Sequence, residues 1–368
     1  MHVLMTADTI GGVWTYCREL VTQLSRKGIR VTLVSFGEIP TSEQTEWLET
    51  LSNVSLHPTA FRLEWMQDAQ ADLKESAALL KDIISETQPD VLHFNQFYYG
   101  GLDCDLPRIV VAHSDVVSWW VSVHGAEPPD NDWIRTYREN VVRGLGGADI
   151  VVAPTQWMLD EARRHYGEPR EKVVVYNGRD PRLFLPYEAK ESLAVSVGRL
   201  WDAGKQAALL LQSDLPLQTV LVGSEQSPAG AVASAQSAGR FPRLNMKGPQ
   251  TEVQLRQLFS RAAMYIATSR YEPFGLAPLE AALSRCAIIA NDIPSLHEVW
   301  GEDAVYFERN NPQSLLLTIQ ELASNSSRMG EYADRAFERA RTQYTSEKMA
   351  EEYLKLYRSL VAVEVATA

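Results

Sequence analysis

The sequence predicts an α/β protein built from two doubly wound units, each with its own parallel sheet. Three observations predict this class. The chain has 368 residues, enough for two domains at roughly 100–200 residues each. Short apolar runs alternate with segments whose apolar residues recur at helical spacing. This alternation fills the first half of the chain and begins again near residue 193.

The first half contains the elements of one unit. A strand is expected at residues 2–7, and the pair Gly11-Gly12 separates it from a helix that ends at Lys27-Gly28. A long helix is expected from Met66 to Thr87, ahead of Pro89. The other expected strands cover residues 30–35, 91–94, 109–112, 149–155 and 173–176, the last of them just before the turn Asn177-Gly178.

The second half repeats the scheme. Its strands are expected at residues 193–197, 219–222, 264–267 and 287–290. We place the domain boundary at 186/187, which gives domains of residues 1–186 and 187–345. Residues 346–361 predict a final helix with one apolar stripe, which requires a surface to pack on. The small-residue stretch 227–239 is expected to be a loop or a weak helix.

Composition and charge exclude several classes of protein. Lys and Arg number 35 against 47 Asp and Glu, for a net charge of −12, so we expect no nucleic-acid partner. The cysteines Cys17, Cys104 and Cys286 are odd in number and far apart, which indicates neither a disulfide framework nor a zinc site. The sequence shows no signal peptide and no run of about 18 apolar residues. A cytoplasmic location is therefore expected, and peripheral contact with the inner face of a membrane stays open.

The expected ligand sites lie at the carboxyl ends of the parallel strands. Gly11 and Gly12 follow the first strand and open a helix, where bare backbone can approach an anionic group. A plain strand-to-helix turn explains the same pair equally well. The full GxGxxG spacing is missing, which argues against a nicotinamide dehydrogenase.

Two cations, Arg199 and Lys205, follow the strand at 193–197 and are separated by a flexible loop that contains Gly204. Cations at a strand end can neutralise a diphosphate leaving group. The alternative is a pair of solvated surface charges. Because two neighbouring cations repel each other in an empty site, we expect the removal of either to change stability little.

The stretch from Ser269 to Glu280 is the most informative, because seven residues separate its two glutamates. Glu272 is expected in the loop after the strand at 264–267, and Glu280 about two turns into the next helix. Gly275, Leu276 and Ala277 would form that helix's first turn, whose N–H groups can bind phosphate oxygens. Two such carboxylates can hold two hydroxyl-bearing parts of one molecule, which suits a sugar. The alternative is an amphipathic helix with a capping glutamate.

These motifs, together with Asn177-Gly178, resemble the retaining glycosyltransferases of family 4 over nearly the whole chain. The resemblance implies the GT-B fold, with two Rossmann-like domains facing across a cleft and a C-terminal helix, residues 346–368, crossing back to the first domain. It implies transfer of a hexose from a nucleotide diphosphate sugar to a saccharide or lipid-linked saccharide, with retention of the anomeric configuration. UDP-glucose is the expected donor, and bacterial surface polysaccharide synthesis the expected pathway.

The resemblance also assigns roles to residues. Glu272 would bind the hydroxyls of the donor sugar and Glu280 the ribose. Arg199 and Lys205 would bind the diphosphate. The remaining expected contacts to the donor come from Phe274, Gly275, Leu276 and Ala277 in the second domain and from Gly11 and Gly12 in the first.

A histidine of the first domain completes the expected catalytic set. The family has a histidine after a strand and close to the donor sugar, and His113 is the best match. His93 and His124 are rivals. We therefore take His113, Glu272, Arg199 and Lys205 as the catalytic candidates.

No cofactor and no metal is expected, because the leaving diphosphate itself would accept the proton of the acceptor. Asp130-Asn131-Asp132 imitates a DxD metal site but follows two prolines, so a polar turn is the preferred interpretation. Gln206, where the family often has Asn, and Val13-Trp14 depart from the family pattern and bear on the acceptor. The run at 116–121, with two tryptophans, is either a stacking surface for the acceptor or a buried helix face.

Two other functions remain as alternatives. A nucleotide-sugar-binding accessory protein without turnover would share the fold, and so would a nucleotide-sugar 2-epimerase. An accessory protein would show no turnover, unlike a transferase. Product analysis distinguishes the 2-epimerase, which needs no second sugar.

Overall fold

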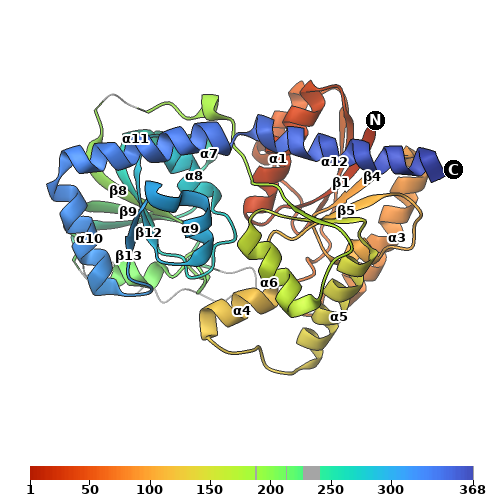
Figure 1. The fold of residues 1–368 in the computed structure, drawn as a ribbon, viewed down its shortest axis with the longest axis horizontal. Coiled ribbons are helices and arrows are strands. Elements are labelled where there is room, and N and C mark those ends of the chain that lie inside the picture. Colours follow the sequence, from red (N-terminus) through yellow and green to blue (C-terminus); the bar gives the residue numbers. More distant parts are fainter. Residues whose placement is uncertain (187–188, 213, 227–240, 368) are drawn as a thin grey trace. The chain divides into compact units, whose positions relative to one another are not determined.

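The computed structural model describes residues 1–186, 189–212, 214–226 and 241–367. The chain forms two compact units (Figure 1). Unit 1 consists of Met1–Val121, Ala126–Gly178 and Ser346–Ala368, and unit 2 consists of Ser122–Gly125 and Arg179–Thr345. Each unit has its own parallel sheet, which confirms the predicted α/β class.

Unit 1 is built on a seven-stranded sheet in the order β3-β2-β1-β4-β5-β6-β7. Each pair of neighbouring strands is parallel. The central strands are buried along their length, as expected when helices cover both faces of a sheet. The strands are β1 (His2–Asp8), β2 (Arg30–Phe36), β3 (Val54–Pro58), β4 (Val91–Phe94), β5 (Arg108–Val111), β6 (Ile150–Ala153) and β7 (Lys172–Val174).

The helices of unit 1 include the last one of the chain, which packs beside the first (Figure 1). Tyr353 and Tyr357 on this last helix are fully buried in the core formed by β1 and the first helix. Gln23 donates a hydrogen bond of 3.0 Å to Ser346 at its start. The helices are α1 (Gly12–Arg26), α2 (Ser42–Thr45), α3 (Gln70–Thr87), α4 (Val116–His124), α5 (Asp132–Gly147), α6 (Gln156–Tyr166) and α12 (Ser346–Thr367). The last residues of α4, from Ser122, are grouped with unit 2.

Unit 2 is built on a six-stranded parallel sheet in the order β10-β9-β8-β11-β12-β13. The central pair, β8 and β11, comes from distant parts of the sequence and brings the ends of two predicted site segments together. The strands are β8 (Glu191–Val197), β9 (Gln218–Val222), β10 (Leu244–Lys247), β11 (Ala262–Ala267), β12 (Ala287–Asn291) and β13 (Val305–Phe307). The helices are α7 (Glu252–Arg261), α8 (Leu276–Leu283), α9 (Pro294–Trp300), α10 (Pro312–Ser324) and α11 (Ser326–Gln343).

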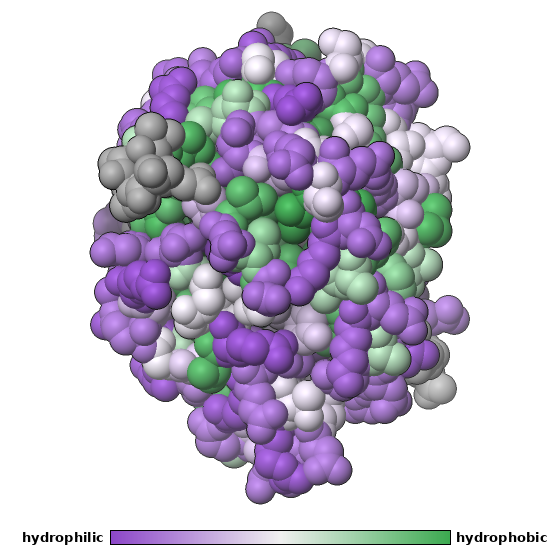
Figure 2. All heavy atoms as spheres, turned by 90° about the vertical axis from the view of Figure 1, so that its right-hand side faces the viewer, coloured by the Kyte–Doolittle hydropathy of each residue, from purple (hydrophilic) through white to green (hydrophobic). Residues whose placement is uncertain are grey.

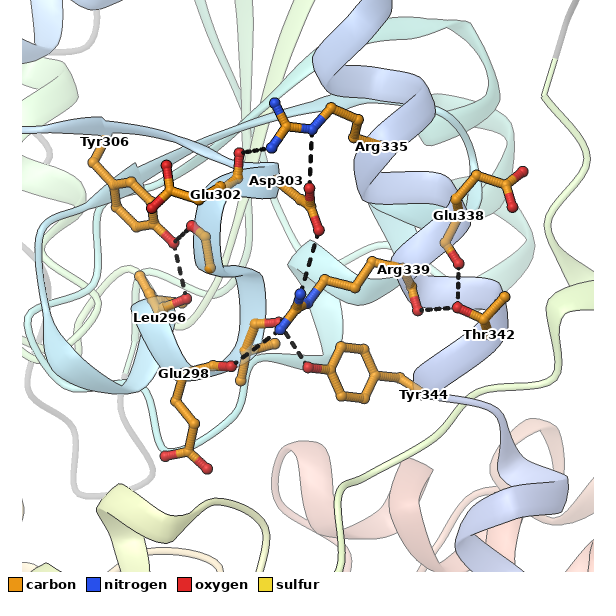
Figure 3. Close-up of polar contacts among 12 residues, drawn as sticks. Leu296, Glu298, Glu302, Asp303, Tyr306, Arg335, Glu338, Arg339, Thr342 and Tyr344 are labelled. Carbon is orange, nitrogen blue, oxygen red and sulfur yellow. Dashed lines mark hydrogen bonds and ion pairs between the residues drawn. The ribbon is translucent and has the colours of Figure 1, made fainter.

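Arginines of α11 hold the C-terminal end of α9 (Figure 3). Arg339 donates to the carbonyl oxygen of Val299 at 2.6 Å and pairs with Asp303 at 3.3 Å. Arg335 pairs with the same carboxylate at 3.0 Å, and the Tyr344 hydroxyl donates to Val299 at 2.7 Å. Cations at a helix C-terminus satisfy its last carbonyl groups and complement its dipole. The cluster therefore fixes the C-terminal end of α9.

The structure differs from the sequence prediction at the sheet edges and at the domain boundary. Strands β3, β10 and β13 were not predicted. The units divide between Gly178 and Arg179 rather than at 186/187, since Arg179 is wholly buried in unit 2. The stretch 227–239 lies outside the described residues.

On the face shown in Figure 2, the described hydrophobic residues form separate patches surrounded by hydrophilic ones. In the described part of the chain, the exposed large apolar side chains are scattered: Met1, Ile39, Val142, Tyr176, Leu185, Val253 and Leu317. Single exposed apolar residues of this kind are normal for a globular protein. None of the described helices is both long and apolar enough to cross a membrane.

Candidate functional site

Glycines at the ends of β8 and β9 let the loop that carries Lys205 pack tightly. The N–H of Gly198 donates to the carbonyl of Val222 at 3.0 Å. A Cβ atom at Gly223 would lie 1.7 Å from the carbonyl oxygen of Gly198, and one at Gly198 would lie 3.3 Å from Cγ of Lys205. Only glycine fits at position 223, because any Cβ atom there would overlap the carbonyl oxygen of Gly198. Lys205 is thereby folded back against the strand ends.

Lys205 contacts the first glutamate of the Glu-x7-Glu stretch. Its Nζ donates to both carboxylate oxygens of Glu272, at 2.8 and 2.6 Å, and the Ser269 hydroxyl donates to the same carboxylate at 2.8 Å. Glu272 is only 8% exposed, so these charge-assisted bonds replace most of its hydration. A small hollow beside them is lined by Gly198, Lys205, Tyr265, Thr268 and Ser269, among others. Two predicted catalytic residues, 67 positions apart, thus meet at one strand edge.

Gly275 makes the turn from this loop into α8. Its φ of +92° lies in the left-handed region, and a Cβ there would lie 2.7 Å from Cγ of Pro278 and 3.2 Å from Cγ of Glu272. α8 begins at Leu276 without a side-chain cap, so its first N–H groups have no partner within the helix. Phe274 is buried and packs edge-on against Tyr344 at 5.4 Å between ring centroids. It anchors the turn, while Leu276 and Ala277 are half-buried at the helix start.

Glu280, the second glutamate, is paired with a buried arginine. It lies on α8, and its Oε1 is 2.9 Å from Nε of Arg179. The two glutamates of the stretch are therefore each matched with a cation, Glu272 with Lys205 and Glu280 with Arg179. The sequence did not single out Arg179.

Arg199 lies in the same loop as Lys205 but outside the contact with Glu272. Its guanidinium donates to Asp202 at 2.7 Å and lies 5.2 Å from the ring centroid of Trp201. Its side chain is 39% exposed. The structure thus brings Lys205 and Glu272 together and leaves Arg199 paired with its own loop.

A buried asparagine network holds the loop before Glu272, and sequence analysis missed it. Asn291, at the end of β12, is 0% exposed and donates to the carbonyl of Ser269 at 3.1 Å and to Asn310 at 2.9 Å. The hydroxyl of Thr268 donates to the carbonyl of Lys205 at 2.8 Å. A polar residue ending an otherwise apolar strand is the signal that could have indicated this role.

His113 in unit 1 follows β5 and is fixed by Asn95. Nε2 of the ring lies 2.7 Å from Oδ1 of Asn95, whose Nδ2 donates to the carbonyl of Thr6 at 2.5 Å. Because Oδ1 can only accept, Nε2 carries the proton and Nδ1 is the acceptor. Burial and the neighbouring His93 lower the pKa of His113 to about 3. The ring is therefore neutral at pH 7 and can accept a hydrogen bond from a hydroxyl group.

The two rival histidines lie in different surroundings. His93 is fully buried in β4, with Nδ1 2.6 Å from the hydroxyl of Tyr357 and Nε2 3.2 Å from that of Tyr16. Both ring nitrogens are engaged by side chains of the core, which indicates a structural role. His124 is exposed at the end of α4.

The Gly11-Gly12 turn of unit 1 is exposed and leaves the start of α1 without a side-chain cap. Gly11 has a φ of +100°, which favours glycine. The N–H of Ile10 donates to Asp8 at 2.6 Å, which fixes the chain before the turn. The geometry suits the approach of a ligand to the helix N-terminus.

The Asp130-Asn131-Asp132 segment has structural partners. Asp130 pairs with Arg135 at 2.6 Å, Asp132 pairs with the same guanidinium, and the Asn131 side chain caps α5. In the part of the chain that the structure describes, no group of three or more His, Cys, Asp or Glu side chains is placed to hold a metal ion.

Comparison with known proteins places this chain among the glycosyltransferases, a class of transferase enzymes. The family model "Glycosyltransferase Family 4" matches residues 10–183, and "Glycosyl transferases group 1" matches residues 189–343. Because the two matches together span most of the chain, it belongs to glycosyltransferase family 4, as the sequence motifs predicted.

Individual relatives and structures agree with this class. The chain is 24% identical over 338 residues to an alpha-maltose-1-phosphate synthase of Mycolicibacterium smegmatis, covering 81% of this chain and 86% of the relative. The sucrose-phosphate synthase of Thermosynechococcus elongatus has a similar structure, with a TM-score of 0.81 at 18% identity, covering 99% of this chain and 100% of the other. Anabaena HepE, solved in complex with UDP and glucose, gives a TM-score of 0.74 at 16% identity over 98% of this chain and 100% of the other. These likenesses establish the GT-B fold.

Proposed function

We propose that this protein is a retaining hexosyltransferase that moves a sugar from a nucleotide diphosphate donor to a hydroxyl group of a saccharide acceptor, without a metal or other cofactor. The observation that carries the proposal is the contact of Lys205 with Glu272 beside the uncapped start of α8. A cation, free N–H groups and a carboxylate at one strand edge provide partners for a diphosphate and for sugar hydroxyls.

Each residue then has a distinct task. Lys205 and the N–H groups at the start of α8 stabilise the negative charge that grows on the leaving diphosphate. Glu272 accepts hydrogen bonds from hydroxyl groups of the hexose, and Glu280 accepts them from the ribose. The leaving diphosphate takes the acceptor's proton, so no carboxylate has to act as the nucleophile, unlike in retaining glycosidases. Neutral His113 accepts a hydrogen bond from the donor sugar.

We infer that the donor is UDP-glucose, and the acceptor a saccharide or lipid-linked saccharide of bacterial surface polysaccharide synthesis. The complex of HepE with UDP and glucose supports the donor. The names of the maltose-phosphate and sucrose-phosphate synthases indicate a second acceptor class, a phosphorylated sugar. Acceptor assays should therefore include both a neutral oligosaccharide and a hexose phosphate.

The test is a thermal-shift screen with UDP, GDP, ADP and their sugars, followed by turnover assays. A ligand at 100 times its Kd stabilises a protein by about 2.7 kcal/mol, which such a screen detects. Binding of UDP with release of UDP from UDP-glucose is the expected result. Nucleotide binding without turnover would instead identify an accessory protein, and turnover without a second sugar a 2-epimerase.

Two variants separate the tasks of the glutamates. Glu272→Gln should lower transfer while leaving the affinity for UDP nearly unchanged, because Glu272 contacts the sugar. Glu280→Ala should weaken UDP binding by about 1.5–3 kcal/mol, the range for a hydrogen bond to a charged group. Equal loss of UDP affinity in both variants would contradict the assignment.

A further inference from the structure

Arg179 is a buried cation that none of these tasks uses. It begins the long segment of unit 2, and its side chain is 0% exposed. Its N–H donates to the carbonyl of Tyr344 at 3.0 Å, and it forms a parallel bridge with Thr345. The guanidinium also lies 5.2 Å from the ring centroid of Phe184. Backbone and ring contacts therefore fix its position.

The guanidinium is shared by two carboxylates of different exposure. Nη2 donates to Oε1 of Glu252 on α7 at 3.1 Å, and Nε lies 2.9 Å from Oε1 of Glu280. The Glu252 side chain is 26% exposed and that of Glu280 is 11% exposed. Water can hydrate much of the first carboxylate but little of the second. The guanidinium therefore stabilises the negative charge of Glu280 more than that of Glu252, because an opposite charge favours the ionised form most where water is scarce.

We propose that Arg179 is a positioning residue for the donor nucleotide, which keeps the Glu280 carboxylate ionised and correctly oriented for the ribose. This inference rests on the proposed function, because it assumes that Glu280 binds the ribose. An ionised carboxylate only accepts hydrogen bonds, which is what two neighbouring hydroxyl groups require. The planar guanidinium fixes the direction of the carboxylate in a way that a lysine ammonium cannot.

The effect should depend on pH once Arg179 is removed. The charged and titratable groups around Glu280 include Arg179 from the connecting segment and Tyr265 from β11. Glu252 of α7 shares the guanidinium and also lies 3.8 Å from Arg256. Burial, with the carboxylates of Glu272 and Glu280 nearby, raises the pKa of Tyr265, so it stays neutral between pH 6 and 8. Loss of the cation makes protonation of Glu280 easier, so nucleotide affinity should fall as the pH is lowered.

The test is the Kd of UDP, GDP and ADP at pH 8 and pH 6 for the wild type and for variants with intact melting transitions. Arg179→Met should weaken the preferred nucleotide about tenfold at pH 8 and further at pH 6. Arg179→Lys should raise KM for the donor several-fold with little change in kcat. Glu252→Gln is the matched control, because it removes the other partner of Arg179, and its Kd should stay within twofold of the wild type.

Each outcome decides the inference. If Arg179→Met does not fold, Arg179→Lys provides the test: the inference requires a higher KM for the donor with little change in kcat. If the Arg179 variants keep the wild-type Kd at both pH values while Glu280→Ala loses affinity, the inference is overturned and the proposed function stands. If Glu252→Gln loses as much nucleotide affinity as Arg179→Met, the inference is overturned, because Arg179 then has only a structural role. A wild type that binds none of the three nucleotides overturns the proposed function, and the inference with it.

Discussion

Removal of the Lys205 ammonium should lower both the stability of unit 2 and the rate of transfer. Lys205 is bonded to both oxygens of a carboxylate that is almost buried. Removing one partner of a buried pair costs about 3–5 kcal/mol, because the other charge is left uncompensated. The Lys205 side chain is 24% exposed, so water screens part of this cost, and we expect about 2–3 kcal/mol for Lys205→Ala. This corrects our sequence-based expectation of little change, which treated the two cations as unpaired.

Calorimetry and initial rates measure the two effects on the same protein. At about 2–4 °C per kcal/mol for domains of roughly 150–250 residues, the melting temperature should fall by about 4–12 °C. The kcat should fall by roughly 10²–10³-fold, as when one preorganised charge stabiliser is lost.

Two controls make the Lys205 prediction specific. The double variant Lys205→Ala/Glu272→Gln leaves no buried charge, so it should recover most of the stability but none of the activity. Arg199→Ala removes a half-exposed cation of the same loop and should change stability by about 0–1 kcal/mol. If Lys205→Ala melts like the wild type, or if the double variant is no more stable than the single one, the pair does not act as described.

Three further predictions concern other parts of the molecule. Burial raises the pKa of Glu64 to about 7, against the opposing effect of the N–H groups of Tyr98 and Phe97; its stabilising contribution is therefore present below about pH 4.5 and lost as the pH rises through about 7. Denaturation experiments should give a free energy of unfolding up to about 3 kcal/mol lower at pH 8 than at pH 5. Glu64→Gln should abolish this difference, and the same pH dependence in the variant and the wild type would refute the prediction. Arg339→Ala removes one of the two donors to the Val299 carbonyl, leaving the Tyr344 hydroxyl, and removes the ion pair with Asp303. It should lower the unfolding free energy by about 1–3 kcal/mol in urea titrations, whereas an unchanged midpoint would show that water replaces the guanidinium. Excess EDTA should leave transfer intact, and a loss that Mn²⁺ restores would identify Asp130 and Asp132 as metal ligands.

The sequence predicts the central strands and the edge strand β7, but misses the other three edge strands, β3, β10 and β13. β1, β4, β11 and β12 are buried along their whole length, so each appears as a mainly apolar run. In the edge strands β3, β10 and β13, most residues are half-buried or exposed. Their apolar signal is weak because one side of an edge strand lies near solvent.

The positions of the candidate residues at strand ends could be predicted from the sequence, but their pairings could not. Lys205 and Glu272 each follow a strand, which the sequence shows. Their contact depends on β8 and β11 being neighbours in the sheet. The order of strands in a sheet cannot be read from a single sequence, so the contact could not be predicted. Arg179 was missed for a related reason, because its partners Glu252 and Glu280 lie on two later helices. Nothing local distinguishes it from the many arginines of the surface.

The return of α12 to unit 1 imposes an order on folding at the ribosome. Unit 1 is interrupted between Gly178 and Ser346, so the 167 residues from 179 to 345 are translated before its last helix exists. At roughly 5–20 residues per second, that interval lasts about 10–30 s. Throughout it, the side of α1 that Tyr353 and Tyr357 later cover remains exposed on the nascent chain. We expect chains arrested before residue 346 to bind chaperones or an apolar dye, and completed chains to lose that binding on release.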